Sequence, residues 1–254
     1  MSQNETIIVD AYRRQAKFTH VSDNNYKGLI INALPGLHQF VGDIAAQSFA
    51  PGAQILDLAS GSGAMCLRLH DFGFCPTACD LVDENFRLHG KIPFLSANLN
   101  RTFHALFQCN FDGIIAAEII EHLENPRHFL RECYSALKPG GHLILTTPNV
   151  DSALARGELV RSGDFKWFGP TSYATSGHIT PLPLLMLMRA LKEAKFDVVK
   201  VTSFGKPLES DWIGWKMKLL MVLLRAVDGI GAQQGEILVL VARRPDVLSS
   251  PADI

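Results

Sequence analysis

The stretch from Gln54 to Leu69 reads QILDLASGSGAMCLRL and holds the clearest structural signals in the chain. It begins with Ile55 to Leu58, a short apolar run typical of a buried parallel strand. The small residues from Ala59 to Gly63 follow, and they permit a tight turn that lets the backbone approach a ligand. The apolar pattern from Ala64 onward predicts a helix. A strand, a glycine turn and a helix N-terminus together bring backbone N–H groups to one point, where they can bind a ligand.

Two kinds of nucleotide-binding fold use this arrangement. Dinucleotide folds follow G-x-G-x-x-G or G-x-G-x-x-A, whereas here Cys66 stands three residues after Gly63, and Asp57 is outside that fingerprint. The run from Asp57 to Gly63 instead resembles the D-x-G-x-G-x-G motif of class I S-adenosylmethionine-dependent methyltransferases, with Ala59 in place of the first glycine. For a glycine loop alone, a tight turn that binds nothing stays open as an alternative.

Length and composition indicate one large domain covering residues 1–254, because 47% of the residues are hydrophobic. The formal net charge of −1 gives no basic field of the kind that attracts nucleic acid. The five cysteines include no C-x-x-C pair, and the polar N-terminus MSQNETIIVDAYRR does not look like a signal peptide. No apolar run reaches the roughly 18–20 residues that span a bilayer. We therefore expect a reduced cytoplasmic protein, at most peripheral to the inner face of a membrane.

Strands are predicted to alternate with helices along most of the chain. The predicted strands are 55–58, 76–81, 92–97, 111–117, 142–146, 197–202 and 236–242, and the predicted helices are two short ones within 26–50, one from 64, one through 126–137 and one through 182–194. This alternation predicts an α/β fold in which helices cover both faces of a mostly parallel sheet. Within it we expect an N-terminal arm and helical cap (1–50), a cofactor-binding core (51–148), a substrate-loop insertion (149–180) and an amphipathic insertion (203–235).

Polar side chains follow three of the predicted strands. Asp57 ends the first strand, Asp80 ends the second, and Asn98 follows the third. Because ligands bind at the carboxyl ends of strands in open α/β sheets, we expect these side chains to face one crevice. A carboxylate there can accept hydrogen bonds from ribose hydroxyls, and an amide can pair with an adenine edge. For Asp80 alone, a solvated loop aspartate is the simpler interpretation.

The resemblance to class I methyltransferases extends over residues 50 to 150 and more weakly to the last strand. It is carried by ILDLASGSGA, ACD, SANLN, FDGIIAAEIIEHLENPRHFLREC and LKPGGHLILTTPN in that order and spacing. The chain looks most similar to the subgroup with the ubiquinone-biosynthesis O-methyltransferases and many small-molecule and sugar methyltransferases. The resemblance implies a seven-strand Rossmann-like sheet with an antiparallel last strand, and S-adenosylmethionine as cofactor.

The same resemblance implies roles for single residues. Asp57, Gly61 and Gly63 would hold the methionine and ribose part, Asp80 the ribose hydroxyls, and Asn98 with Leu99 the adenine. Many relatives have aspartate at the place of Asn98, and asparagine keeps an acceptor oxygen. The full predicted cofactor set is Asp57, Ala59, Gly61, Gly63, Asp80, Leu81, Asn98, Leu99 and Glu118.

Glu118, Glu121 and His122 follow the fourth strand at spacings that would place them on one face of a helix. Three roles stay open. The trio could bind a divalent cation, as matching residues are thought to do in the ubiquinone O-methyltransferases. His122 could be a general base. The three residues could also orient the loop through hydrogen bonds, which we favour, so that no metal site is expected.

His178 lies in Ser176-Gly177-His178-Ile179-Thr180, after the long insertion and beside the expected crevice. It is predicted to be a base or a substrate contact, and the alternative is a residue at a helix start with Thr180 as the N-cap. The aromatic residues Trp167, Phe168 and Tyr173 either line a substrate pocket or pack the loop onto the sheet.

The segment 212–227 has aromatic and basic residues at its ends and an apolar centre, LLMVLL. It is too short to span a bilayer, and it suits either an interfacial membrane helix or a buried helix, a lid or a homodimer face. Trp212 and Trp215 are its aromatic residues.

We therefore expect a methyltransferase that moves the sulfonium methyl group of S-adenosylmethionine to a small-molecule acceptor, with a hydroxyl oxygen favoured over an amine. His122 and His178 are its candidate catalytic residues. The alternatives are a membrane-associated enzyme for a prenylated or lipid-linked acceptor, and a non-catalytic S-adenosylmethionine-binding module. A nicotinamide oxidoreductase is disfavoured by Asp57 and Cys66.

Overall fold

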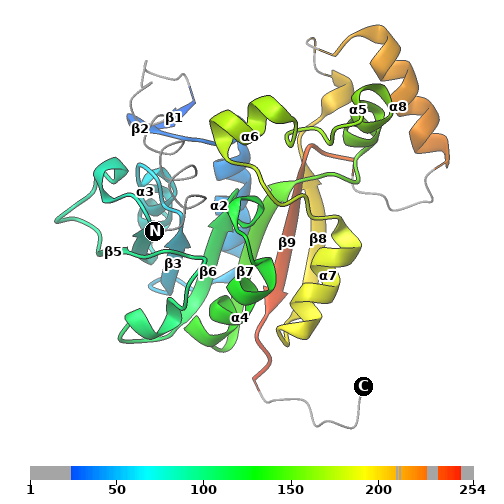
Figure 1. The fold of residues 1–254 in the computed structure, drawn as a ribbon. Coiled ribbons are helices and arrows are strands. Elements are labelled where there is room, and N and C mark those ends of the chain that lie inside the picture. The colour runs from blue at the N-terminus through cyan, green and yellow to red at the C-terminus, as the bar shows by residue number, and fades with distance from the viewer. Residues whose placement is uncertain (1–23, 210, 212, 228–233, 247–254) are drawn as a thin grey trace, which may run out of the picture.

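The computed structural model describes residues 24–209, 211, 213–227 and 234–246 (Figure 1). Its centre is a seven-stranded sheet with the order β5-β4-β3-β6-β7-β9-β8. All neighbouring strands are parallel except β9, which is antiparallel to both β7 and β8. The strands are β3 (Gln54–Leu58), β4 (Cys75–Asp80), β5 (Phe94–Ser96), β6 (Phe111–Ala117), β7 (Leu137–Pro148), β8 (Asp197–Phe204) and β9 (Ile237–Arg243). The predicted Rossmann-like sheet with an antiparallel last strand is confirmed.

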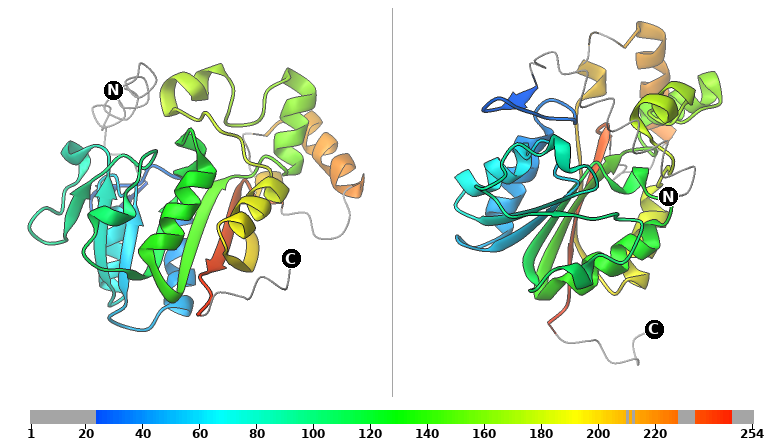
Figure 2. Two further views of the ribbon diagram at one scale, coloured as in Figure 1. Left: turned by 60° about the horizontal axis from the view of Figure 1, so that its bottom comes forward. Right: turned by 60° about the vertical axis from the view of Figure 1, so that its left-hand side comes forward.

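Helices cover both faces of this sheet, as predicted (Figure 2). On one face, α2 (Leu37–Ser48) and α3 (Ala64–Asp71) pack on side chains such as Ile115 and Ile144. On the other face, α4 (Pro126–Ala136) and α7 (Leu184–Glu193) pack on side chains such as Ile114 and Leu143. Successive strand residues point to opposite faces, so continuous apolar runs fill two cores at once.

The N-terminal cap differs from the prediction. Instead of two short helices within 26–50, the structure has a hairpin of β1 (Asn25–Tyr26) and β2 (Leu29–Ile30), and only α2 is helical. Lys27 and Gly28 form the two-residue turn with φ values of 49° and 85°, which is the conformation that hairpin turns require. The Lys27-Gly28 pair is the sequence signal of this turn. The predicted arm at residues 1–23 lies outside the described residues.

Both insertions contain helices that the sequence analysis did not place. The 149–180 insertion holds α5 (Ala153–Ser162) and α6 (Pro170–Ser176). Ser152 caps α5 by accepting a hydrogen bond from the Ala155 N–H, and Gly163 ends it with φ 80°. The second insertion holds the short 3₁₀ helix Pro207–Glu209 and α8 (Trp215–Val227), which packs against α5. Trp212 lies outside the described residues.

The glycine turn between β3 and α3 has a left-handed backbone at three positions: Ala59 (φ 60°), Gly61 (φ 52°) and Gly63 (φ 91°). Only glycine adopts this conformation without a steric penalty, which is about 1–2 kcal/mol for other residues. Ala59 therefore stores strain at the position where the family motif has glycine. Its methyl group offsets part of this cost by packing against the core.

Replacing Ala59 by glycine is expected to leave the free energy of unfolding unchanged or to raise it by up to about 1 kcal/mol, since relief of strain offsets the lost methyl contact. The matched control is Ala46→Gly, at an exposed position within α2, which should lower the free energy of unfolding by about 1 kcal/mol. Urea unfolding of both variants checks the difference. Equal losses for the two variants would contradict the strained conformation of Ala59.

Candidate active site

Two cavities lie at the edge of the sheet where the parallel strands end. The smaller cavity is bordered by the ends of β3, β4 and β6 and by the segment after β5. The larger cavity lies between the segment before α2, the end of β6 and the 149–180 insertion. His122 lines both cavities, so the two meet at this side chain.

The smaller cavity collects most of the predicted cofactor residues. Those that line it are Ala59, Asp80, Leu81, Asn98 and Leu99. Glu118, which was predicted with them, lines the larger cavity instead. The expectation that side chains after successive strands meet in one crevice thus holds for Asp80 and Asn98.

Asp80 is buried at the end of β4 and links that strand to the glycine turn. Its Oδ2 accepts a hydrogen bond from the Gly61 N–H at 2.8 Å, and its Oδ1 accepts one from the Val82 N–H at 3.0 Å. Burial raises the pKa of Asp80 above its ordinary value, while these backbone donors act in the opposite direction. A carboxylate has about four acceptor sites, so the backbone donors do not use all of them.

Gly61 and Gly63 have different functions in the turn. A Cβ atom at Gly61 would meet nothing within 4 Å, so open space lies beside this backbone. A Cβ atom at Gly63 would approach the side chains of Phe86 and Leu88 to 2.9 Å. Gly63 therefore allows close packing, whereas Gly61 leaves room for a ligand next to Asp80. The Asp80 carboxylate and the Asn98 amide at this cavity are groups that can hydrogen-bond a ribose and an adenine edge.

Asp57 and Asn98 are engaged within the protein. The buried carboxylate of Asp57 accepts a hydrogen bond from the Cys66 thiol at 3.0 Å, and burial raises its pKa to about 7. Asp57 is not among the residues that line the two cavities. Asn98 uses its Oδ1 to accept the Asn100 N–H at 2.9 Å, which fixes the loop after β5. Cys66 and Asn100 were not assigned a function from the sequence.

The predicted helix face with Glu118, Glu121 and His122 is wrong. Glu118 has a left-handed backbone (φ 53°), and only Ile120–His122 form a single 3₁₀ turn. The Glu118 carboxylate points to β7, where its Oε1 accepts from the Thr146 hydroxyl at 2.8 Å. Glu121 is fully buried and its Oε2 accepts from the Thr147 hydroxyl at 3.1 Å. The i, i+3, i+4 spacing therefore does not bring the three groups onto one face.

The sequence analysis assigned no role to Thr146 and Thr147, which contact the two glutamates. They stand at the end of β7, next to β6 in the sheet, and each holds one of the two glutamates. Their sequence signal is their place at the carboxyl end of a parallel strand. Polar residues there face the same crevice as Asp80 and Asn98.

His122 contacts the segment that holds Gly177 and His178, although Gly177 lies 55 residues further along the chain. The Gly177 carbonyl oxygen accepts from His122 Nδ1 at 3.1 Å, and the rings of His122 and His178 meet edge to face with centroids 4.8 Å apart. The backbone N–H groups of Ile179 and Thr180 donate to the Glu121 carbonyl oxygen. These contacts join the end of the insertion to the 3₁₀ turn after β6.

The alternative for His178, a structural residue before a helix with Thr180 as the cap, does not match the geometry. The Thr180 hydroxyl donates to the Leu123 carbonyl oxygen, and α7 begins only at Leu184. His178 Nδ1 donates to the Trp167 carbonyl oxygen at 2.7 Å. Because a carbonyl only accepts, Nδ1 carries the proton and Nε2 of the neutral ring keeps its lone pair. Trp167 lines the larger cavity, Phe168 lies beside His178, and Tyr173 is exposed.

Burial sets the protonation states of this cluster. It lowers the pKa of His122 to about 3 and lowers the pKa of His178, so both rings are neutral at pH 7. It also raises the pKa of Glu118 to about 7 and the pKa of Glu121 well above its ordinary value, with the nearby Glu118 charge adding to the effect at Glu121. The 3.9 Å contact between Glu121 Oε1 and His122 Nε2 is therefore not a charged pair.

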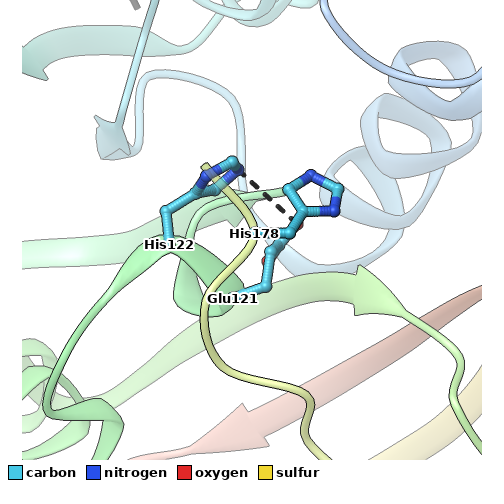
Figure 3. Close-up of side chains that lie close together, drawn as sticks. All are labelled: Glu121, His122 and His178. Carbon is cyan, nitrogen blue, oxygen red and sulfur yellow. Dashed lines mark ion pairs between the residues drawn. The ribbon is translucent and has the colours of Figure 1, made fainter. Parts of the chain in front are cut away.

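Glu121, His122 and His178 form the one group of potential metal ligands found among the described residues (Figure 3). Their ligand atoms lie within 4.8 Å of one another, and Glu121 Oε1 has no hydrogen-bond partner. The sequence analysis considered Glu118, Glu121 and His122 as cation ligands, whereas the structure groups His178 with Glu121 and His122. One carboxylate and two imidazoles suit a borderline divalent cation.

The raised pKa values make stability depend on pH. Asp57 and Glu118 have folded-state pKa values of about 7, so above about pH 4.5 the folded protein holds protons that the unfolded chain has released. This stabilisation is lost as the pH rises through the folded pKa. His38, His122, His142 and His178, whose folded pKa values are lowered by burial, act in the opposite direction, mainly below about pH 6.5, where the unfolded chain binds protons. At higher pH their effect is smaller than that of the carboxyl groups. The free energy of unfolding is therefore expected to fall by at least about 1 kcal/mol between about pH 6.5 and pH 8.

Urea unfolding at several pH values checks this expectation. In Glu118→Gln the side chain is neutral but can still accept from Thr146, so the fall should be smaller. The control is Glu124→Gln at an exposed site, which should reproduce the wild-type fall. Stability that is constant or rises over this range would show that the glutamates are ionised.

The comparisons with known proteins agree with this geometry. The model of a family described as a methyltransferase domain matches residues 33–201. The mitochondrial ubiquinone biosynthesis O-methyltransferase of Rattus norvegicus is 33% identical over 109 residues, which are 39% of this chain and 31% of that protein. The chain thus matches about a third of the length of this relative.

Solved structures share the fold at low sequence identity. A SAM-dependent methyltransferase from Archaeoglobus fulgidus has a TM-score of 0.57 at 16% identity, over 81% of this chain and 94% of that one. The [4+2]-cyclase SpnF has a TM-score of 0.58 at 15% identity, over 95% and 94% of the chains. Both likenesses concern the fold. S-adenosylmethionine is the cofactor implied by the family match together with this fold, as predicted. The chain belongs to the methyltransferase domain family, and it has the fold of an S-adenosylmethionine-dependent methyltransferase.

Proposed function

We propose that this protein transfers the methyl group of S-adenosylmethionine to a hydroxyl oxygen of a small molecule bound in the larger cavity. The observation that carries the proposal is the position of His122, which lines both cavities. A cofactor in the smaller cavity and an acceptor in the larger one would meet beside this ring. The similarity to ubiquinone biosynthesis O-methyltransferases supports an oxygen acceptor.

His178 is the residue best arranged to be the general base. It lines the larger cavity, its ring is neutral, and its Nε2 lone pair is fixed by the hydrogen bond of Nδ1 to the Trp167 carbonyl. A hydroxyl needs such a base, because its proton must leave as the oxygen forms a new bond. A positioned base of this kind contributes about 10²–10⁴-fold to the rate.

His122 and Glu121 then have a positioning function. His122 Nδ1 holds the Gly177 carbonyl, and the Glu121 carbonyl holds the two N–H groups that follow His178. His122 is also the more deeply buried ring, with its pKa at about 3. A ring so hard to protonate is a poor proton acceptor, so its function is to align His178 where the two cavities meet.

The reaction balances with these groups. S-adenosylmethionine supplies an electrophilic methyl group on a positively charged sulfur. The acceptor oxygen forms a bond to the methyl carbon while the carbon–sulfur bond breaks, the sulfur takes the bonding electron pair, and the hydroxyl proton passes to Nε2 of His178. Asp80 and the Gly61 backbone hold the nucleoside end, and the walls of the larger cavity hold the acceptor. Alignment of the two reactants supplies most of the acceleration.

Replacing His178 by asparagine is expected to lower kcat by about a hundredfold, because the amide N–H can still donate to the Trp167 carbonyl but no base remains. Methyl transfer to the best acceptor from a panel of hydroxylated aromatics and sugars measures kcat. The Kd for S-adenosylhomocysteine should stay unchanged, since His178 does not line the smaller cavity. His128→Asn, on α4, is the control and should keep wild-type kcat.

The same assay with and without a chelator separates the base from a metal role. We expect full activity after dialysis against EDTA. Activity that is lost on dialysis and restored by Mg²⁺ or Zn²⁺ would assign Glu121, His122 and His178 to a cation and would overturn the base. A wild-type kcat in His178→Asn would also overturn the role of His178 as the base. Binding of S-adenosylhomocysteine without turnover of any acceptor would favour the non-catalytic module.

A further inference from the structure

Helix α8 presents an unusual apolar surface to solvent. The exposed fractions are 71% for Trp215, 53% for Leu219, 51% for Val222 and 57% for Leu223. These residues recur at i, i+4, i+7 and i+8, so they form one stripe along the helix. We call these four residues the outer stripe.

The outer stripe is not the packing face of α8. On the opposite side, Met221 is completely buried in a small core with Ala153, Leu154 and Ile213. Met217 packs so closely on Gly157 of α5 that a Cβ atom there would lie 2.7 Å from its sulfur. The helix is therefore held in place by one apolar face and leaves a second one uncovered.

Helix α5 extends this surface. Val160, one turn beyond Gly157, is 72% exposed. The two helices stand together at the margin of the molecule, on the side of the sheet where β7 ends (Figures 1 and 2). This is also the edge at which the larger cavity lies, since Pro148 at the end of β7 lines it.

The charges on these two helices are mostly basic. Helix α5 carries Arg156, Glu158 and Arg161, and α8 carries Lys216, Lys218 and Arg225. Five basic side chains and one carboxylate give a formal charge of +4, whereas the whole chain has −1. The flanking residues add Asp151, Asp164, Glu209 and Asp211 against Lys166 and Lys206, which brings the formal charge to +2. Within α5, Glu158 pairs with Arg161. Basic charge is thus concentrated where apolar side chains are exposed.

We propose that α5 and α8 form a membrane-binding surface, in which the outer stripe and Val160 enter the interface of a bilayer with anionic lipids. An interfacial helix combines apolar side chains on one face, basic side chains at its borders and an aromatic ring near the headgroups, here Trp215 with Lys216 beside its ring. No helix in the described part of the chain is long and apolar enough to cross the bilayer, so the contact is peripheral.

The charge favours a lipid surface over a second copy of this chain. In a symmetric dimer the same patch would face itself, and its basic side chains would repel one another across the contact. Anionic headgroups instead attract each of them. The proposal rests on this surface alone and does not depend on the acceptor.

Flotation with vesicles tests the proposal on the full chain. The wild type should float with vesicles that contain phosphatidylglycerol at low salt, and much less with pure phosphatidylcholine or at high salt. The double variant Leu219→Asp with Leu223→Asp should lose at least about tenfold in vesicle affinity, since two apolar side chains leave the interface. The matched control is Leu185→Asp with Met186→Asp, two exposed positions on α7, which should bind as the wild type does.

Binding of S-adenosylhomocysteine by each variant checks that it is folded, and it separates this test from the proposed function. Wild-type protein that stays at the bottom of the gradient with anionic vesicles would overturn the proposal. Equal flotation of the α8 variant and the wild type would do so as well. A dimer in solution that the α8 variant breaks, with no vesicle binding, would assign the surface to a second copy.

Discussion

The site depends on the hydrogen bond that the Gly61 N–H donates to the Asp80 carboxylate. It ties the end of β4 to the glycine turn after β3, and the second oxygen of Asp80 fixes the backbone at Val82. Adjacent strand ends are thereby held in one geometry. The smaller cavity is built on this link, since Ala59, Leu81 and Asp80 all line it. Removing the carboxylate would release the turn and also the acceptor groups for a ribose.

Local signals predicted the sheet and most of the residues that line the smaller cavity. Short apolar runs mark the strands, and a polar residue at a strand end needs no knowledge of distant contacts to be placed at the crevice. The same reasoning reached Asp80 and Asn98 but was not applied to Thr146 and Thr147. The helical spacing that predicted one face for Glu118, Glu121 and His122 failed, because the backbone is left-handed at Glu118. The contact of His122 with the Gly177–His178 segment is a tertiary contact, so the sequence offered both histidines without showing that they meet.

Fold alone does not determine the chemistry of this protein. The fold is shared with methyltransferases and with a [4+2]-cyclase, so the reaction has to be argued from side chains. The 149–180 insertion supplies Trp167, Ser176 and His178 to the larger cavity, which is the proposed acceptor site. The same insertion supplies α5, on which α8 packs. One insertion thus joins the larger cavity to the apolar surface at the margin of the molecule.

Calorimetric titration with S-adenosylhomocysteine tests the central claim, that the smaller cavity holds the nucleoside of the cofactor. The wild type should bind with a Kd in roughly the micromolar range and show no binding of NADH. Asp80→Ala should bind at least about tenfold more weakly, because the ribose hydroxyls lose a charged acceptor. No binding by the wild type, a preference for NADH, or equal affinity of the folded Asp80→Ala variant would contradict the account.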